Sequence, residues 1–257
     1  KIEVIKGPAA TLYGNASGGV ISIFTQVPEE KNNIDLATTI GSFGMFKTRI
    51  TAGTNFGKSS ILINGNHTIS DGYRDQSGFK STSLNAKMQH RFSQQSKLHI
   101  NLNYTDSPNA WDPGGLTATE VNENRRQARQ RNVEFKTKEA IDHLKIGTHY
   151  EYQGDAFRLQ SYAFYANRTF YGMLPFEFGG VVDLNRNYYG GGINANFKQK
   201  INQIHNTVQL GLDIASQEDQ RDRFYNVSGT AGTQTMGQME SFHALGFYIL
   251  DQLTIGE

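Results

Sequence analysis

The stretch of sequence that decides the fold reads Leu98-His99-Ile100-Asn101-Leu102-Asn103-Tyr104. Apolar side chains occupy every second position, and polar side chains occupy the positions between them. Successive side chains of a β-strand point to opposite faces of its sheet, so this alternation predicts a strand with one apolar and one polar face. The pattern recurs at Thr82–Gln89, Tyr189–Lys198 and Val208–Ile214.

Ten strands of this kind can be drawn along the chain, at about 34–41, 45–55, 60–70, 80–92, 97–105, 139–152, 156–171, 187–200, 207–216 and 241–252. The connections between them alternate in length. The short turns fall at Asn55–Lys58, Ser93–Ser96, Gln153–Asp155 and Ile201–Asn206, and the longer loops at Asp71–Phe79, Asp106–Lys138, Gly172–Arg186 and Gln217–Glu240. The first of the loops, at Ser42–Gly44, is short. Short turns facing the periplasm and long loops facing outside are typical of outer-membrane barrels. A soluble β-protein is the alternative.

Composition agrees with a strand-rich chain and excludes several other classes. Hydrophobic residues make up only 37% and the mean hydropathy is −0.53, yet aromatic residues reach 11%, which a disordered chain would lack. The net charge of +1 gives no global field for nucleic acid. Without cysteine there is no disulfide, Cys-based zinc site or thiol nucleophile. The sequence has no run of about 18 apolar residues, so it predicts no transmembrane helix.

The segment before the strands has a different character. Lys1–Lys6 predicts a short strand that Gly7-Pro8 ends, Ala9–Tyr13 predicts one helical turn, and Val20–Thr25 predicts a second strand after a glycine-rich stretch. Residues 27–31 read as a polar connector. The absence of an initiator Met suggests the middle of a longer protein.

Three parts of this segment carry a resemblance: Ile2–Pro8, Leu12–Asn15 and Gly18–Ile23. Together they resemble the C-terminal part of the plug domain of TonB-dependent outer-membrane transporters, with Gly7, Pro8, Tyr13, Gly14, Gly18 and Gly19 as the structural motif of that plug. The resemblance implies an all-β, antiparallel transmembrane β-barrel of 22 strands with the plug folded inside it. Residues 1–30 would then end the plug, and residues 31–257 would form the first part of the barrel.

The resemblance also implies a function. Such a protein binds a scarce ligand at the bacterial outer membrane and imports it to the periplasm with energy from a TonB-type coupling protein. The stretches Asp112–Thr117, Asn124–Ala128 and Asn132–Phe135 are similar to the third extracellular loop of members near the ferric-citrate type, which implies a ferric siderophore or ferric citrate-like chelate. Lipid and lipopolysaccharide would surround the barrel, with no nucleic-acid partner and no cofactor.

Other functions stay open. The same family carries cobalamin, haem, saccharides and pyrroloquinoline quinone, and a passive porin would also be a barrel. A barrel enzyme is disfavoured because neither Gly-x-Ser-x-Gly nor His-Glu-x-x-His occurs.

Candidate ligand-binding residues lie in the predicted extracellular loops: Arg74, Trp111, Arg125, Arg126, Arg129 and Arg168. If Glu120–Arg131 is a helix, Arg125 and Arg129 share one face of it. Guanidinium groups clustered in this way could bind an anionic chelate through bidentate contacts. Alternatively, they pair with nearby glutamates or with lipopolysaccharide phosphates. Trp111 could stack on a ligand or anchor the barrel at the membrane interface.

Aromatic and histidine side chains leave further alternatives. Aromatic side chains gather near the predicted strand ends, at Tyr104, Tyr150, Tyr152, Phe170, Tyr171, Tyr188, Tyr189 and Phe197. They could form an aromatic girdle at the membrane interface or ordinary cross-strand pairs. His143 and His149 share a strand face but lie about 20 Å apart at the usual strand rise. They cannot share a metal ion, and the sequence predicts no metal site.

Overall fold

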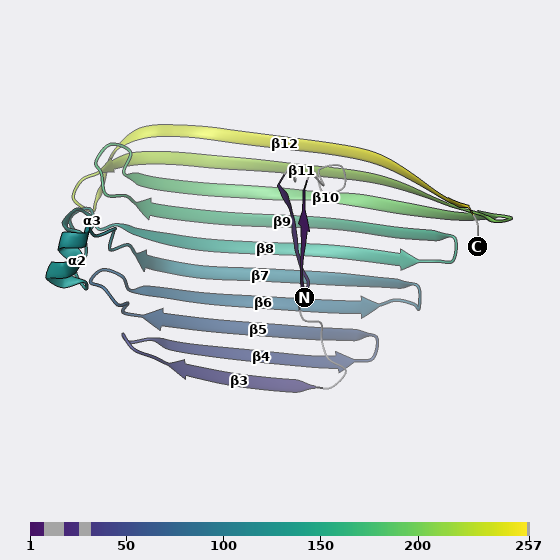
Figure 1. The fold of residues 1–257 in the computed structure, drawn as a ribbon, viewed down its shortest axis with the longest axis horizontal. Coiled ribbons are helices and arrows are strands. Elements are labelled where there is room, and N and C mark those ends of the chain that lie inside the picture. Colours follow the sequence, from purple (N-terminus) through teal and green to yellow (C-terminus); the bar gives the residue numbers. More distant parts are fainter. Residues whose placement is uncertain (8–17, 26–31, 256–257) are drawn as a thin grey trace.

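A computed structural model describes residues 1–7, 18–25 and 32–255 of the chain. Ten antiparallel strands form one sheet in chain order (Figure 1). They are β3 (Asn33–Ile40), β4 (Phe46–Phe56), β5 (Ser59–Ser70), β6 (Phe79–Arg91), β7 (Ser96–Trp111), β8 (Lys138–Gln153), β9 (Phe157–Met173), β10 (Val181–Ile201), β11 (Ile204–Asn226) and β12 (Ala231–Ile255). The predicted all-β class and the ten predicted strands are confirmed.

Two of the predicted loops are wrong, because strand continues through most of them. The connection after β9 spans only residues 174–180, and the one after β11 only residues 227–230. The ladder persists there, for example between Asn185 and Gln220. Residues 217–223 of β11 are polar on both faces, and in Val181–Arg186 apolar and polar side chains do not alternate, so the pattern that predicts a strand is missing from both stretches.

The sheet carries an apolar row on its outer face. Residues paired across an antiparallel ladder share a face, and one such row crosses eight strands as Ile34, Ala52, Ile63, Ala86, Leu102, Ile146, Tyr165 and Tyr189. Ile34, Ile63, Ile146, Tyr165 and Tyr189 of this row are exposed. A broad exposed apolar surface of this kind is the face that a transmembrane barrel turns to lipid.

Aromatic rings lie on both sides of this row. On the turn side, Phe157 contacts Tyr152 at 6.1 Å and Phe197 at 5.1 Å between ring centroids. On the loop side, the Tyr104 hydroxyl donates to the Asp142 carboxylate at 2.8 Å, and within the row the hydroxyls of Tyr165 and Tyr189 donate to Asn187 and Glu218. The rings therefore pair across strands and also occupy the two edges of the apolar row, as aromatic belts of outer-membrane barrels do.

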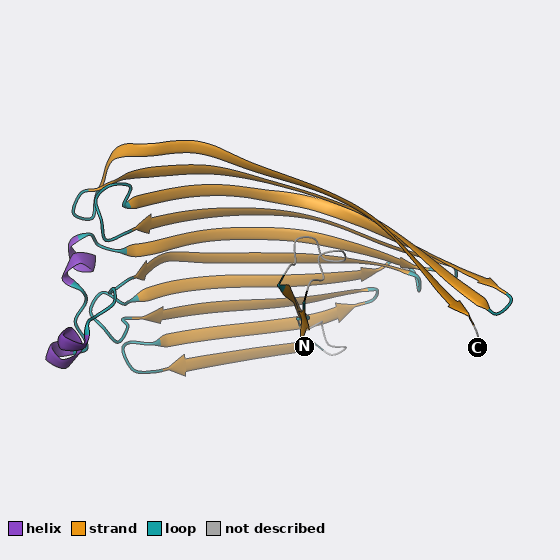
Figure 2. Ribbon diagram, turned by 45° about the horizontal axis from the view of Figure 1, so that its top comes forward, coloured by secondary structure: helices purple, strands orange, loops and turns teal. Residues whose placement is uncertain are grey.

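The sheet is strongly curved, and its later strands extend further on the turn side (Figures 1 and 2). Curvature with such a stagger is what barrel closure requires. Within the described residues, the edge strands β3 and β12 each pair on one side only.

A second, two-stranded sheet lies in front of the concave face (Figure 1). It pairs β1 (Ile2–Lys6) with β2 (Gly19–Ile23), so both strands predicted before the barrel are confirmed. Gly19 has φ +130°, and a Cβ there would lie 2.4 Å from the carbonyl oxygen of Ile5, so no other residue fits without distortion. Gly7 also has a positive φ, of 98°. Pro8, Tyr13, Gly14, the helical turn predicted at residues 9–13 and the connector at 27–31 lie outside the described residues.

The continuous helix over Glu120–Arg131 that would place Arg125 and Arg129 on one face is not formed. The structure has two short helices instead, α2 (Ala118–Asn124) and α3 (Gln130–Glu134). The Asn124 side chain accepts a hydrogen bond from the Arg126 backbone N–H at 3.0 Å, a local turn that competes with helix continuation. Arg125 and Arg129 therefore do not share a helical face. Among the described residues, no helix is long and apolar enough to cross a membrane.

Candidate ligand-binding face and loops

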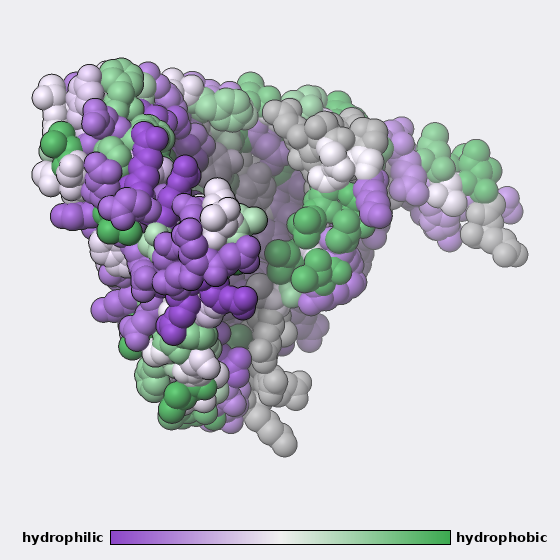
Figure 3. Space-filling view, turned by 60° about the vertical axis from the view of Figure 1, so that its left-hand side comes forward, coloured by the Kyte–Doolittle hydropathy of each residue, from purple (hydrophilic) through white to green (hydrophobic). Residues whose placement is uncertain are grey.

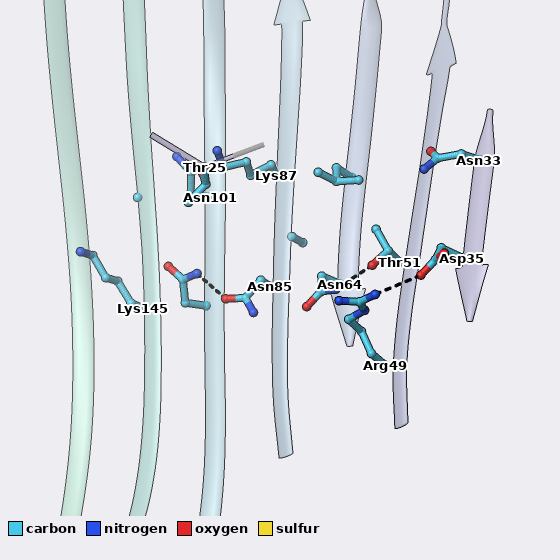
Figure 4. Close-up of a pocket in the computed structure, with 14 residues that line it drawn as sticks. Thr25, Asn33, Asp35, Arg49, Thr51, Asn64, Asn85, Lys87, Asn101 and Lys145 are labelled. Atoms are coloured by element: carbon cyan, nitrogen blue, oxygen red, sulfur yellow. Dashed lines mark hydrogen bonds and ion pairs between the residues drawn. The ribbon is translucent and has the colours of Figure 1, made fainter. Parts of the chain in front are cut away.

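The concave face of the sheet is polar, in contrast to the outer face. A hollow of about 850 Å³ lies against it and is lined by side chains of β3 to β8 together with Thr25, which follows β2 (Figure 4). Strand periodicity produces this arrangement, because each residue next to an apolar outward position points inward. The hollow therefore lies between the barrel wall and the end of the β1–β2 sheet.

Amide side chains line this hollow in register. Asn64 donates to the Thr51 hydroxyl at 2.8 Å, and Asn103 donates to Asn85 at 2.7 Å (Figure 4). These four residues occupy one cross-strand row that continues to Lys145. The side chains of this row offer hydrogen-bond donors and acceptors and carry no excess of negative charge. Such a surface can form hydrogen bonds with a hydrated polar solute that moves along it.

Basic side chains also reach into the hollow. Lys87, Lys145 and Arg49 line it, and Asp35, the only carboxylate among the described residues that line it, lies 3.5 Å from Arg49 (Figure 4). Lys145 also lies over the Phe164 ring, 6.0 Å from its centroid. The charge balance of this part of the wall is positive, which favours an anionic solute.

The outer end of the sheet is covered by its connections, and residues 112–137 form the longest. Its helix α2 begins with a capping box: Thr117 accepts from the Glu120 backbone N–H at 3.3 Å, and the Glu120 carboxylate accepts from the Thr117 backbone N–H at 2.6 Å. That second hydrogen bond holds the pKa of Glu120 below its usual value. Figure 3 shows this end as largely hydrophilic, with a hollow behind it.

Arg74 ties the second connection to the third. Its guanidinium donates to the carbonyl oxygens of Gln127 at 3.0 Å, Gly114 at 2.6 Å and Pro113 at 3.1 Å. The planar, multidentate group thereby pairs with three loop carbonyls, of which that of Pro113 also accepts from the Arg129 backbone N–H. Arg74 contributes to holding the shape of the long connection.

Arg126 ties the first three connections together. Its guanidinium lies 5.5 Å from the Phe43 ring centroid and 5.8 Å from that of Tyr73, and its Nε donates to the Tyr73 carbonyl at 3.2 Å. The two rings also meet edge to face at 5.2 Å. This cation–π contact joins residues from three separate turns of the chain.

The remaining candidates are placed differently. Arg125 and Arg129 are exposed on the long connection, and neither side chain hydrogen-bonds to another described residue. Arg168 lies on the concave face, in register with His143 and Arg186. Trp111 ends β7, with the Lys138 ammonium 5.3 Å from its ring centroid. The structure therefore separates these residues over the loops and the wall, and their role as ligand contacts stays a prediction.

Asn226 joins three connections at once and was not foreseen from the sequence. Its side chain is fully buried, its amide donates to the carbonyls of Phe135 at 3.0 Å and Leu174 at 3.1 Å, and its oxygen accepts from the Gly229 N–H at 2.7 Å. Such a residue can be found only by knowing which turns meet in space.

We expect Asn226→Ala to loosen this loop cover, because it leaves buried carbonyls unpaired at about 1–3 kcal/mol each. Limited proteolysis should then cut residues 112–137 at least about tenfold faster, while the strands stay protected. Gln220→Ala is the control, because Gln220 is exposed and donates only to the neighbouring Asp222. Equal cleavage of the two variants would contradict this role.

A group of three side chains on the wall was also missed. His99 and His149 are direct partners across β7 and β8, and Glu151 follows on the same face as His149. The ligand atoms of the three residues lie within 4.8 Å of one another. The spacing of residues along the sequence relates histidines within one strand. It does not reveal a pair of histidines from two strands that the longest connection separates in the chain.

Solved structures of transporters and receptors share the fold. The unliganded ferric citrate transporter FecA matches with a TM-score of 0.76 and 20% identity, over 99% of this chain and 40% of that chain. The open form of the ferric-catecholate import receptor Fiu from E. coli K12 gives 0.77 and 13%, over 98% of this chain and 46% of that chain. The described residues therefore share the fold of these transporter and receptor structures.

This receptor fold accommodates more than one cargo among the solved structures. The copper transporter OprC matches with a TM-score of 0.66 and 15% identity, over 100% of this chain and 40% of that chain. The chain thus spans less than half the length of each of these three proteins. No protein-family model matches the chain.

Proposed function

We propose that this chain is the end of the plug and the first part of the barrel of an active outer-membrane transporter. In this assignment residues 1–30 belong to the plug and residues 31–257 to the barrel. The observation that carries the proposal is the position of the β1–β2 sheet, which shares hollows with the concave wall: Gly19, Val20 and Ile21 face one, and Ile23, Phe24 and Thr25 another. A blocked path needs an energy source to open, which a TonB-type coupling protein would supply.

We further propose that the cargo is a ferric siderophore or a ferric citrate-like chelate. Support comes from the basic side chains at the loops and on the wall, where Arg125, Arg129 and Arg168 have no hydrogen-bonded partner among the described residues. Guanidinium groups bind carboxylates strongly and bidentately. Arg74 and Arg126 would support binding indirectly, by holding the connections in place, and Trp111 would offer a flat surface at the rim.

Replacing Arg125, Arg129 and Arg168 together by Ala should weaken binding of ferric citrate about tenfold or more, because charge-assisted hydrogen bonds contribute about 1.5–3 kcal/mol each when desolvated. Isothermal titration of the full-length protein in detergent measures the affinity for ferric citrate. Raised salt should reduce the difference in affinity between the triple variant and the unaltered protein. Arg131→Ala is the matched control, since Arg131 lies over the Phe135 ring at 5.8 Å on the same connection. An unchanged triple variant would remove these residues from the proposal.

A passive porin is the competing function, and planar-bilayer conductance of the full-length protein separates the two. A barrel occupied by a plug should be nearly silent, whereas an open porin gives steady large currents. Cobalamin, haem, saccharides and pyrroloquinoline quinone are the competing cargoes. Titration with each of them beside ferric citrate and a ferric catecholate identifies the class.

A further inference from the structure

The His99, His149 and Glu151 group has the composition of a transition-metal site. Glu151 Oε1 lies 3.4 Å from His149 Nδ1 and 3.9 Å from His99 Nε2, and the two imidazole rings stack at 5.9 Å between centroids. Neutral imidazoles with one carboxylate suit Zn²⁺ and other divalent first-row ions.

The distances are close to those that coordination requires. Bonds of about 2.0–2.1 Å to a tetrahedral Zn²⁺ place ligand atoms about 3.3 Å apart. The 3.4 Å pair already meets this spacing, and the 3.9 Å pair exceeds it by about half an ångström. All three ligand atoms lie within 4.8 Å of one another, so the side chains would have to close in on the ion, while adjacent strands of a continuous ladder hold the backbone of the three residues.

Lys97 orients the carboxylate of the group. Its ammonium lies 3.1 Å from Glu151 Oε2, and Lys97 is the cross-strand partner of Glu151. This contact occupies the oxygen that points away from the imidazoles and leaves Oε1 to face them. Partners of ligating carboxylates tune metal sites in this way. The positive charge of Lys97 also limits the affinity, which favours an exchangeable ion over a permanent structural one.

The group opens onto a hollow that the plug segment also lines. His99, His149 and Glu151 face this hollow of about 500 Å³ together with Ile23, Phe24 and Thr25. The side chains of His99 and His149 are 27% and 34% exposed, so an ion can enter and keep a coordination position directed at the hollow. Sites with three protein ligands and one open position bind exchangeable water or a further ligand.

We propose that His99, His149 and Glu151 form a binding site for a divalent transition-metal ion on the inner wall of the barrel, beside the plug. The site uses wall residues that the proposed chelate-binding loops do not include. The ion would bind through protein ligands rather than inside a chelate.

The test uses Zn²⁺ alone with the full-length protein, free of any histidine tag, in detergent. Isothermal titration should show one fewer Zn²⁺ bound per chain in His99→Gln/His149→Gln, and each single substitution should weaken that site about tenfold or more. His143→Gln is the control, because His143 lies on the same strand and the same face as His149. Lys97→Gln should instead tighten binding, since it removes a competing charge next to the carboxylate.

Co²⁺ absorption gives an independent readout in the unaltered protein. The expected visible bands are those of nitrogen and oxygen ligands in a four- or five-coordinate site, lost in the double variant. A double variant that binds as much Zn²⁺ as the unaltered protein would overturn the proposal, as would loss of Zn²⁺ in His143→Gln alone. Unchanged ferric citrate affinity in the double variant would separate this site from the proposed transport function.

Discussion

Ile63→Arg is expected to prevent stable insertion of the barrel, with a loss of about 2–4 kcal/mol in the free energy of unfolding. Ile63 lies on β5 in the apolar row, between its partners Ala52 and Ala86, and its side chain is exposed on the outer face. If this row faces hydrocarbon, a guanidinium there loses its hydration and has no counter-charge on the neighbouring strands.

Asn64→Arg is the matched control for this substitution. Asn64 is the next residue on β5 but lines the polar hollow, so the same guanidinium there remains hydrated. We expect only the loss of its hydrogen bond to Thr51, about 1 kcal/mol. Denaturant titration in detergent and the heat-dependent mobility of the folded barrel on gels measure both variants. Equal loss in the two would contradict the assignment of the faces.

The strands could be predicted where one face is apolar and the other polar. From β3 to β9 the predicted bounds fall within about two residues of the observed ones, except that β7 continues to Trp111 instead of ending near residue 105. Lipid on one side and water on the other impose an alternation that is visible in residues such as Leu98 to Tyr104. The outer ends of β10, β11 and β12 lack that contrast. There Asn185 and Asn187 alternate with Arg186, so hydropathy alone could not separate strand from loop.

The candidate site was less predictable because it depends on contacts between distant segments. The sequence identified the long connection and its arginines, but it did not show that Arg74 would contact the carbonyls of Pro113 and Gly114. Nor did it place His149 opposite His99, because the ladder register across residues 112–137 follows from the whole sheet. Local patterns predicted the wall, whereas the groups on it required the pairing of strands.

Arg186→Met should produce the other large loss of stability, because it breaks a buried ion pair. Asp219 is 1% exposed, and Arg186 reaches it from the partner strand with Nε 2.8 Å from Oδ1. Removing one member of a buried pair leaves an uncompensated charge and costs about 3–5 kcal/mol. The Arg186 side chain is about one-third exposed, which places the expected value near the lower end, about 3 kcal/mol.

Arg221→Met is the matched control for Arg186→Met, because Arg221 pairs with Glu240 at 3.3 Å and both side chains are about one-third exposed. Exposed pairs contribute less than about 1 kcal/mol, so this variant should unfold nearly as the unaltered protein does. In Arg186→Met the buried Asp219 carboxylate retains a hydrogen bond from Gln217 but loses the cation that pairs with it.

Thermal unfolding of both variants at neutral pH measures the difference between the two losses of stability. Adding Asp219→Leu to Arg186→Met should restore much of the stability, since no unpaired charge then remains in the wall. Equal losses in the Arg186 and Arg221 variants would show that the pair is effectively solvated, and the outer ends of β10 and β11 would then be open to water on their inner face as well.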